Sequence, residues 1–323
     1  MKYSNMTVSF APHIHNKATT NRIMLDVIIA LIPAFMASVA VFGPRAALVT
    51  CVCVATCVFC EWAFEKALKR KNTINDLSAV VTGMLFAFNL PVTVPVWQAI
   101  FGSFVAIIFI KQLFGGLGKN FANPAITSRV IMFFAFPITM TTWVLPSLNA
   151  ATCSWTWIWP GIDAVTGATP LAVMSKSGIN AMPGIRDLFL GIHGGCLGET
   201  SELALLLGGI YLIIRRVISW HTPVIYIATV FILTTLIGSH PVHQLFSGGL
   251  FIGAIFMATD YVTTPLTKKG RAIFGLGAGL LTVLIRLFGN YPEGVSFAIL
   301  LMNMIVPYIN KITYSKALGG LKS

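Results

Sequence analysis

Long apolar stretches, separated by short clusters of basic residues, constrain the fold of this 323-residue chain more than any other feature. A transmembrane helix needs about 20 mostly apolar residues in a row. Only 10% of the residues are charged, whereas soluble domains carry about 25%. The pattern therefore predicts an all-α polytopic membrane protein and excludes a soluble enzyme. Ten stretches meet or approach the required length: Ile23–Phe42, Ala46–Ala63, Leu77–Leu90, Val96–Leu113, Ala125–Leu145, Leu203–Ile214, Pro223–Ile237, Gln244–Ala258, Ala272–Phe288 and Val295–Ile309.

The net charge of +12 comes from lysines and arginines that gather in alternate loops between these stretches. Short loops rich in lysine and arginine stay in the cytoplasm, so the charge indicates membrane orientation and not a nucleic-acid partner. A polar start containing Lys17 and Arg22 does not resemble a cleavable signal, which predicts that the first span is retained. Both termini are expected in the cytoplasm. The predicted inside segments contain Lys2, Lys17 and Arg22; Lys66, Lys69, Arg70 and Lys71; Lys119; Arg215 and Arg216; Lys268, Lys269 and Arg271; and Lys311, Lys316 and Lys322.

A single long connection, about residues 146–202, divides the chain into two halves of five predicted spans. We therefore expect an N-terminal unit (1–145), an extracytoplasmic loop (146–202) and a C-terminal unit (203–323). Ala99–Gly102 followed by Leu113–Gly115 recurs as Ala272–Gly275 followed by Leu287–Gly289. Because five is an odd number, the second copy must enter the membrane from the opposite side, which predicts two inverted five-helix repeats.

Few charged residues fall within the predicted spans. Asp26, Arg129, Lys111, Arg286 and Asp260 all lie near span ends, where each can reach the membrane interface or complement a helix terminus. If an ion crosses this chain, neutral oxygens are expected to coordinate it. The candidates are Asn89, Thr82, Asn123 and Thr259.

The cysteines leave two alternatives open. Cys53, Cys57 and Cys60 recur at helical spacing, which suits either an iron–sulfur centre or, as we favour, simple packing between helices. No zinc-type spacing accompanies them, and no metal site is predicted. Cys153 and Cys196 lie in the long loop, and the sequence leaves their state open.

A glycine-rich run, residues 115–124, lies between the fourth and fifth spans. Glycines allow a backbone to approach a ligand closely, and asparagines supply both donors and acceptors. A tight loop before a helix that starts with proline explains the same run without a ligand. The candidate binding residues are Gly115, Gly116, Gly118, Asn120 and Asn123.

The long loop contains Asp163-Ala-Val-Thr166-Gly167-Ala168-Thr169-Pro170-Leu. Thr169 followed by Pro170 predicts a helix start, with Thr169 as its N-cap. A phosphate ester on that hydroxyl would lie in the positive field of a helix N-terminus. An ordinary capped helix explains the local residues equally well.

The complete pattern, Asp-x-x-Ser/Thr-Gly-Ala-Thr, resembles the motif at which flavin transferases attach FMN to the last threonine through a phosphodiester. With ten spans in two halves, the chain is similar to a family of flavinylated membrane proteins. That family comprises the D subunit of the Rnf complex and the B subunit of the sodium-pumping NADH:quinone reductase. The quinone reductase protein has a long extension before its first span, whereas only about 22 residues precede Ile23 here, which favours the Rnf branch.

This resemblance implies a redox subunit of an ion-translocating ferredoxin:NAD oxidoreductase in the cytoplasmic membrane of a bacterium or archaeon. FMN on Thr169 would relay electrons, Asp163 would serve recognition by the transferase, and Thr166, Gly167 and Ala168 would shape the acceptor loop. A second, noncovalent flavin such as riboflavin would use the 115–124 run. The sequence has no Gly-x-Gly-x-x-Gly fingerprint at a strand-to-helix turn, so NAD and ferredoxin chemistry is assigned to partner subunits.

Two other functions suit the same pattern. A passive channel or transporter for a small polar solute also has many spans and few buried charges, and the quinone-reducing paralogue shares the motif. Neither the coupling ion nor the direction of electron flow follows from the sequence.

Overall fold

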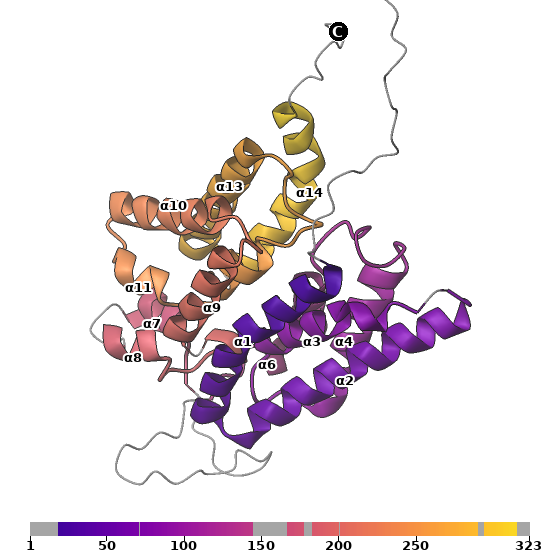
Figure 1. Cartoon of the computed structure of the whole chain (residues 1–323). Coiled ribbons are helices and arrows are strands. Elements are labelled where there is room, and N and C mark those ends of the chain that lie inside the picture. The colour runs from indigo at the N-terminus through magenta and orange to yellow at the C-terminus, as the bar shows by residue number, and fades with distance from the viewer. Residues whose placement is uncertain are drawn as a thin grey trace, which may run out of the picture.

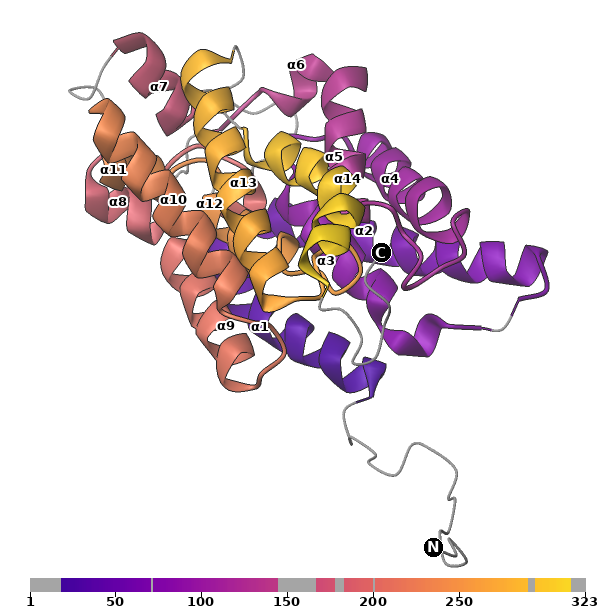
Figure 2. The same ribbon diagram turned by 90° about the horizontal axis from the view of Figure 1, so that it is seen from above.

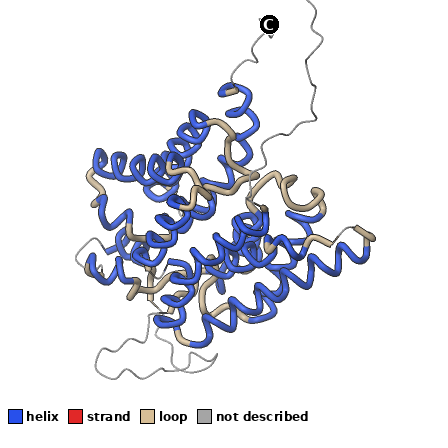
Figure 3. The backbone as a smooth tube through the Cα atoms, in the orientation of Figure 1, coloured by secondary structure: helices blue, strands red, loops and turns tan. Residues whose placement is uncertain are grey.

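The computed structural model (Figure 1) describes residues 19–70, 72–144, 167–177, 183–199, 201–289 and 294–314. In these ranges the regular structure is helical, as Figure 3 shows, which confirms the predicted all-helical class. The longer elements are α1 (Thr20–Phe42), α2 (Pro44–Ala67), α3 (Ser78–Phe88), α4 (Val96–Phe104) continuing as η2 (Val105–Gln112), α5 (Pro124–Ala135), α9 (Glu202–Ile214), α10 (His221–Ile237), α13 (Lys268–Phe288) and α14 (Val295–Thr313). The shorter ones are η1 (Ile74–Asp76), α6 (Pro137–Met140), α7 (Pro170–Ser177), α8 (Ile185–Leu190), η4 (Leu197–Glu199), α11 (Pro241–Leu245) and α12 (Leu250–Ile252) continuing as η5 (Gly253–Met257).

Four helices in the described part of the chain are long and apolar enough to cross a membrane. They are α1, α2, α13 and α14, with 19 to 24 residues and mean hydropathies of 1.5 to 2.4. Shorter apolar helices accompany them, namely α3, α4 with η2, α5, α9 and α10. The chain is therefore a multi-pass membrane protein by length and composition.

Three predicted spans are broken or short. Leu77–Leu90 contains the 11-residue helix α3, about 16 Å long at 1.5 Å per residue, which is too short to cross a bilayer alone. Gln244–Ala258 is split between α11 and α12, because Gly248 and Gly249 adopt positive φ angles of 74° and 62°. Ala125–Leu145 breaks before Pro137, where α5 ends and α6 begins. Phe136, the residue before this proline, has a non-helical φ of −134° and ψ of 61°, and helical geometry is disfavoured at the residue before proline.

Local sequence signals explain where several helices begin. Thr19 caps α1, Asn123 caps α5, Ser201 caps α9 and Thr267 caps α13, each side chain accepting a hydrogen bond from a backbone N–H of the first turn. These are the side chains that satisfy the unpaired amides at a helix start. The polar residues between the apolar runs thus set the helix starts that position the site.

The two halves of the chain lie side by side in Figure 1, the first in indigo to purple and the second in orange to yellow. Within the first half, α2 packs on α3 and α4; within the second, α13 packs on α10 and α14. The halves meet where α1 packs on α9 and α5 packs on α14 (Figure 2). The buried apolar core continues across this junction, so side chains from both halves come together there.

The cysteines of α2 lie as their spacing predicts, on the face turned into the protein. Cys53, Cys57 and Cys60 are buried free thiols, and the Cys57 thiol lies 4.0 Å from the carbonyl oxygen of Ser103. Among the residues that the structure describes, no three His, Cys, Asp or Glu side chains gather as metal ligands would.

Candidate functional site

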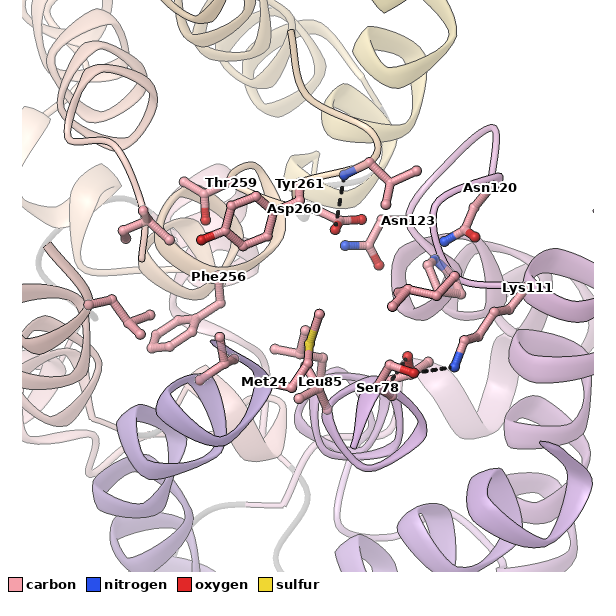
Figure 4. Close-up of a pocket in the computed structure, with 18 residues that line it drawn as sticks. Met24, Ser78, Leu85, Lys111, Asn120, Asn123, Phe256, Thr259, Asp260 and Tyr261 are labelled. Atoms are coloured by element: carbon pink, nitrogen blue, oxygen red, sulfur yellow. Dashed lines mark hydrogen bonds between the residues drawn. The ribbon is translucent and has the colours of Figure 1, made fainter. Parts of the chain in front are cut away.

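A pocket lies at the junction of the two halves and encloses about 730 Å³, part of it open to the surroundings. Figure 4 shows Lys111, Asn120 and Ser78 on one side and Phe256, Thr259 and Tyr261 on the other. Both halves therefore contribute to one cavity with apolar walls and a few polar groups.

The predicted asparagines reach this pocket. Asn120 and Asn123 both line it, and the buried Oδ1 atom of Asn120 has no hydrogen-bond partner among the described residues. The Oδ1 atom of Asn123 caps α5 by accepting from Ala125 N at 3.0 Å, and its Nδ2 donates to Met257 O at 3.5 Å. The unpartnered amide oxygen of Asn120 is the feature that indicates a ligand, because such a group is costly to bury unsatisfied.

The glycines of the same run have a different role. Gly115, Gly116 and Gly118 adopt positive φ angles of 113°, 88° and 92°, which residues with a Cβ rarely adopt. They do not line the pocket. The three glycines form the turn that precedes Asn120 and Asn123. Their role therefore agrees with the tight loop that explains the run without a ligand.

Three of the four predicted neutral ion ligands also border this cavity: Thr82, Asn123 and Thr259. Asn89 does not, because it ends α3 elsewhere and its Oδ1 accepts from Arg129 Nη1 at 3.0 Å. Arg129 also donates to Ser296 Oγ at 3.1 Å and to the buried thiol of Cys196 at 3.3 Å. Arg129 therefore joins α3, α5 and α14, and its side chain is buried between them.

Lys111 differs most from its prediction. Its side chain is 1% exposed, and it pairs with Glu61 at 2.8 Å instead of reaching the interface. Sequence reasoning missed Glu61 and its neighbour Glu65, which are also buried. The available signal was their spacing of four residues near the end of a mostly apolar helix, which does not identify Lys111 as the partner.

Arg286 complements a helix terminus, as predicted. It donates to the carbonyl oxygens of Gln244 (2.6 Å), Ser247 (2.8 Å) and Gly248 (3.1 Å), which lie at and just after the end of α11. These contacts satisfy carbonyl groups left over at a broken helix.

The two aspartates near span ends also have local partners. Asp26 pairs with Arg215 at 3.2 Å. The Arg215 side chain is about half exposed, so the carboxyl group of Asp26 is linked to the protein surface. Asp260 borders the pocket just after η5, and its Oδ2 accepts from Thr263 Oγ1 at 3.2 Å. The cavity therefore has one carboxyl group beside its neutral oxygens.

The predicted helix start at Thr169 is confirmed. Thr169 Oγ1 accepts from Ala172 N at 3.3 Å, and α7 begins at Pro170. The Thr169 side chain is only 4% exposed, whereas Ala168 is exposed. Gly167 N donates to Trp143 O at 3.0 Å. Asp163, Thr166 and Cys153 lie outside the described residues, and Cys196 is a free thiol.

Comparison with known proteins gives a consistent result over the whole chain. Residues 7–319 match the NQR2, RnfD, RnfE family. The D subunit of the Na(+)-translocating ferredoxin:NAD(+) oxidoreductase complex of Acetobacterium woodii is 46% identical, with 100% of this chain and 98% of the relative aligned. The proton-translocating counterpart of Clostridium ljungdahlii is 41% identical, covering 99% and 98%. The corresponding protein of the ion-translocating oxidoreductase complex of Stutzerimonas stutzeri is 39% identical, covering 94% and 93%.

Proposed function

The chain belongs to the NQR2, RnfD, RnfE family, and from this premise we propose that it is the D subunit of an ion-translocating ferredoxin:NAD⁺ oxidoreductase complex. The observation that carries the proposal is identity of 46% and 41% to such proteins over nearly their entire length. The chain is then a redox component of a translocase that works with the other subunits of that complex. A passive channel or a quinone-reducing paralogue explains these full-length relationships less well.

FMN covalently bound to Thr169 is the cofactor that the loop supports. The Thr169 hydroxyl lies at the N-terminus of α7, where a phosphodiester would meet unpaired backbone amides and the positive end of the helix. Ala168 is exposed beside it and Gly167 has no side chain to obstruct the approach. Bound there, FMN would supply one- or two-electron transfer, while the protein provides attachment and orientation.

The burial of Thr169 bears on how attachment occurs. Because its hydroxyl is turned inward as a helix cap, a flavin transferase can reach it only when the cap is open. We infer that attachment precedes the docking of α7 onto the protein. Asp163 and Thr166 would serve recognition by the transferase.

Attachment can be separated from helix capping by two substitutions. Thr169→Asp keeps a strong N-cap but removes the hydroxyl acceptor, whereas Thr169→Ser keeps both. We expect Thr169→Asp to insert normally and carry no covalent flavin, and Thr169→Ser to retain some. Flavin fluorescence in a denaturing gel and peptide mass spectrometry measure this. Flavin on a fragment without Thr169, or no flavin on the unsubstituted protein, would refute the assignment, and the second result would favour the channel.

A second, noncovalent flavin is the occupant that we assign to the pocket. The apolar walls suit a flat aromatic ring, and Asn120 offers an unpartnered amide oxygen to a ring N–H. Asn120→Leu should weaken riboflavin binding about tenfold, the effect of losing one buried hydrogen bond of about 1.4 kcal/mol. Quenching of riboflavin fluorescence measures the Kd. Asn21→Ala, an exposed substitution on α1, is the control that should leave it unchanged.

The helix arrangement supports two inverted repeats of five spans. Counterparts in the two halves pair with each other, since α1 packs on α9 and α5 packs on α14, as elements related by a twofold axis do. The third element of each half, α3 and the α12–η5 segment, is short. Broken helices at the repeat interface are typical of inverted-repeat membrane proteins. Both termini would then lie in the cytoplasm, and residues 146–202 outside.

A further inference from the structure

We propose that Glu65, Thr73, Glu61, Lys111 and Ser78 form a chain of hydrogen bonds that carries protons from the surface near the end of α2 to the pocket. The inference rests on the proposed flavin in that pocket for its proton acceptor. The chain lies entirely in the first half of the molecule and is separate from the covalent flavin loop.

The outer part of the chain joins two buried carboxyl groups through one hydroxyl. Thr73 Oγ1 lies 3.2 Å from Glu61 Oε1 and still closer to Glu65 Oε1, and Thr73 N donates to Glu65 Oε2 at 3.0 Å. A hydroxyl has one hydrogen to donate. The Thr73 hydrogen is therefore shared between the two carboxyl groups, and a proton taken up by Glu65 would let Thr73 donate fully to Glu61.

Glu65 lies nearer the end of α2 than Glu61 and is the carboxyl group at which the proposed chain takes up a proton. Glu61 accepts from Lys111 Nζ at 2.8 Å and 3.0 Å and from Gln112 Nε2 at 2.9 Å, contacts that stabilise an ionised carboxylate. Protonated Glu65 can then donate to Thr73, and Thr73 can donate to Glu61. The result is a directed sequence of donors from the surface toward Lys111.

The inner part of the chain ends on a hydroxyl at the pocket wall. Lys111 Nζ has three hydrogens and three oxygen neighbours, the third being Ser78 Oγ at 2.7 Å. Because Ser78 Oγ accepts from the ammonium group, its own hydrogen is available to the pocket. Ser78 and Lys111 both line the cavity, and Figure 4 shows the bond between them.

Burial isolates this chain from water along most of its length. Lys111 and Glu61 are each 1% exposed, and Glu65 and Ser78 are also buried, whereas Thr73 is half-buried in the loop after α2. Cys57 on α2 and Arg70, which donates to Gln112 O at 3.2 Å, also lie near the pair, and Asp260 borders the same pocket. A buried ion pair adds little net stability, which favours a functional reason for its position beside a pocket.

Proton movement along the chain balances at each atom. When Ser78 Oγ gives its hydrogen to the pocket ligand, Lys111 Nζ replaces it, and Glu61 returns a proton to Lys111. Glu61 receives the Thr73 hydrogen, Thr73 receives a proton from Glu65, and Glu65 takes that proton up from surface water beside Thr73. One proton enters the pocket for one taken from water, and every side chain returns to its starting state once the Thr73 and Ser78 hydroxyls have rotated back.

Two variants interrupt the chain with small changes in shape: Ser78→Ala at the pocket end and Glu65→Gln at the surface end. Glu202→Gln alters a buried glutamate elsewhere and serves as the matched control. In purified protein loaded with riboflavin, a laser flash reduces the flavin with an added sacrificial electron donor such as EDTA, and a pH-indicator dye records proton uptake. Riboflavin Kd is measured separately by fluorescence quenching.

We expect proton uptake about 100-fold slower in both chain variants and unaltered in the control, as for loss of a general acid. Riboflavin affinity should be unchanged in Glu65→Gln, which does not line the pocket, and the Kd of Ser78→Ala sets the riboflavin concentration at which that variant is fully loaded. Equal uptake rates in all fully loaded proteins would overturn the relay and leave the flavin site intact. Failure of the unsubstituted protein to bind riboflavin would instead contradict the flavin site, and the relay with it. Should Ser78→Ala misfold, Thr73→Val interrupts the chain at its middle and decides between the same outcomes.

Discussion

At the scale of single residues, His193 gives the chain a defined response to pH. The side chain is 3% exposed, and its Nε2 has no partner among the described residues. Burial lowers the pKa of His193, while the hydrogen bond to Gly194 O and the charge of Glu199 act in the opposite direction. The neutral ring is therefore the form that the fold stabilises.

The sign of the resulting pH effect follows from this shift. A histidine whose pKa is lowered in the folded state stabilises the fold at pH values above its ordinary pKa of 6.5. This stabilisation is lost as the pH falls through the lowered pKa. We expect the thermal midpoint in detergent to decrease below pH 6.5, and His193→Gln to reduce that decrease. Parallel pH profiles for the two proteins would contradict the assignment.

Residue-level prediction from sequence succeeds where the signal is local. Thr169 is predictable as an N-cap because the next residue is proline. Asn120 and Asn123, singled out because they follow a run of glycines, line the pocket, and their role in binding stays a prediction. The Lys111–Glu61 pair escapes prediction because its partners are 50 positions apart. Nothing in either apolar segment indicates that the two charges meet, so an interfacial position is equally consistent with the sequence.

At the scale of elements, hydropathy locates the helices but not their breaks. The apolar content of the predicted span Leu77–Leu90 is the same whether α3 continues past Asn89 or stops there. The break between α11 and α12 depends on tertiary contacts, since a Cβ on Gly248 would lie 2.2 Å from Leu171 Cδ1. Asp163 and Thr166, also predicted as site residues, lie outside the described structure and stay predictions.

The close packing of α1 on α9 requires glycine at position 208. A Cβ on Gly208 would lie 2.2 Å from Ala30 O, a backbone atom that cannot move aside alone. Gly208→Ala should therefore separate the helices and cost about 1–3 kcal/mol, as overpacking does. Gly184→Ala is the control, because its Cβ would make only an ordinary contact of 3.5 Å with Asp187 Oδ2. The thermal midpoints of the two variants should differ clearly, and equal midpoints would show that the helices are not held this closely.

At the scale of the whole molecule, the proposed orientation predicts which surfaces face the cytoplasm. Arg186 on α8 and Lys269 on α13 are both exposed, and the basic-residue pattern places them on opposite sides. An impermeant thiol reagent applied to intact cells should label Arg186→Cys and label Lys269→Cys only after permeabilisation. The unsubstituted protein corrects for its own six cysteines. The reverse pattern would place the flavin loop in the cytoplasm.

The choice of coupling ion is also a question for the whole molecule, because the oxygens that could bind an ion at the pocket come from both halves. Arg129 already occupies the amide oxygen of Asn89, which leaves Thr82, Asn123 and Thr259 as neutral candidates. In the proposed relay, the proton carried by Lys111 and Ser78 would be consumed in the pocket, so it would not be the ion that crosses the membrane.

A sodium ion held by neutral oxygens at broken helices is therefore the chemistry that we expect. In vesicles containing the whole complex, electron transfer should require sodium and drive uptake of labelled Na⁺ that an uncoupler does not abolish. Asn123→Ala should weaken the sodium dependence more than the flavin content, because it removes the side chain that links α5 to Met257 O; Asn21→Ala should do neither. Turnover without sodium, accompanied by proton pumping that the uncoupler collapses, would rule out this mechanism.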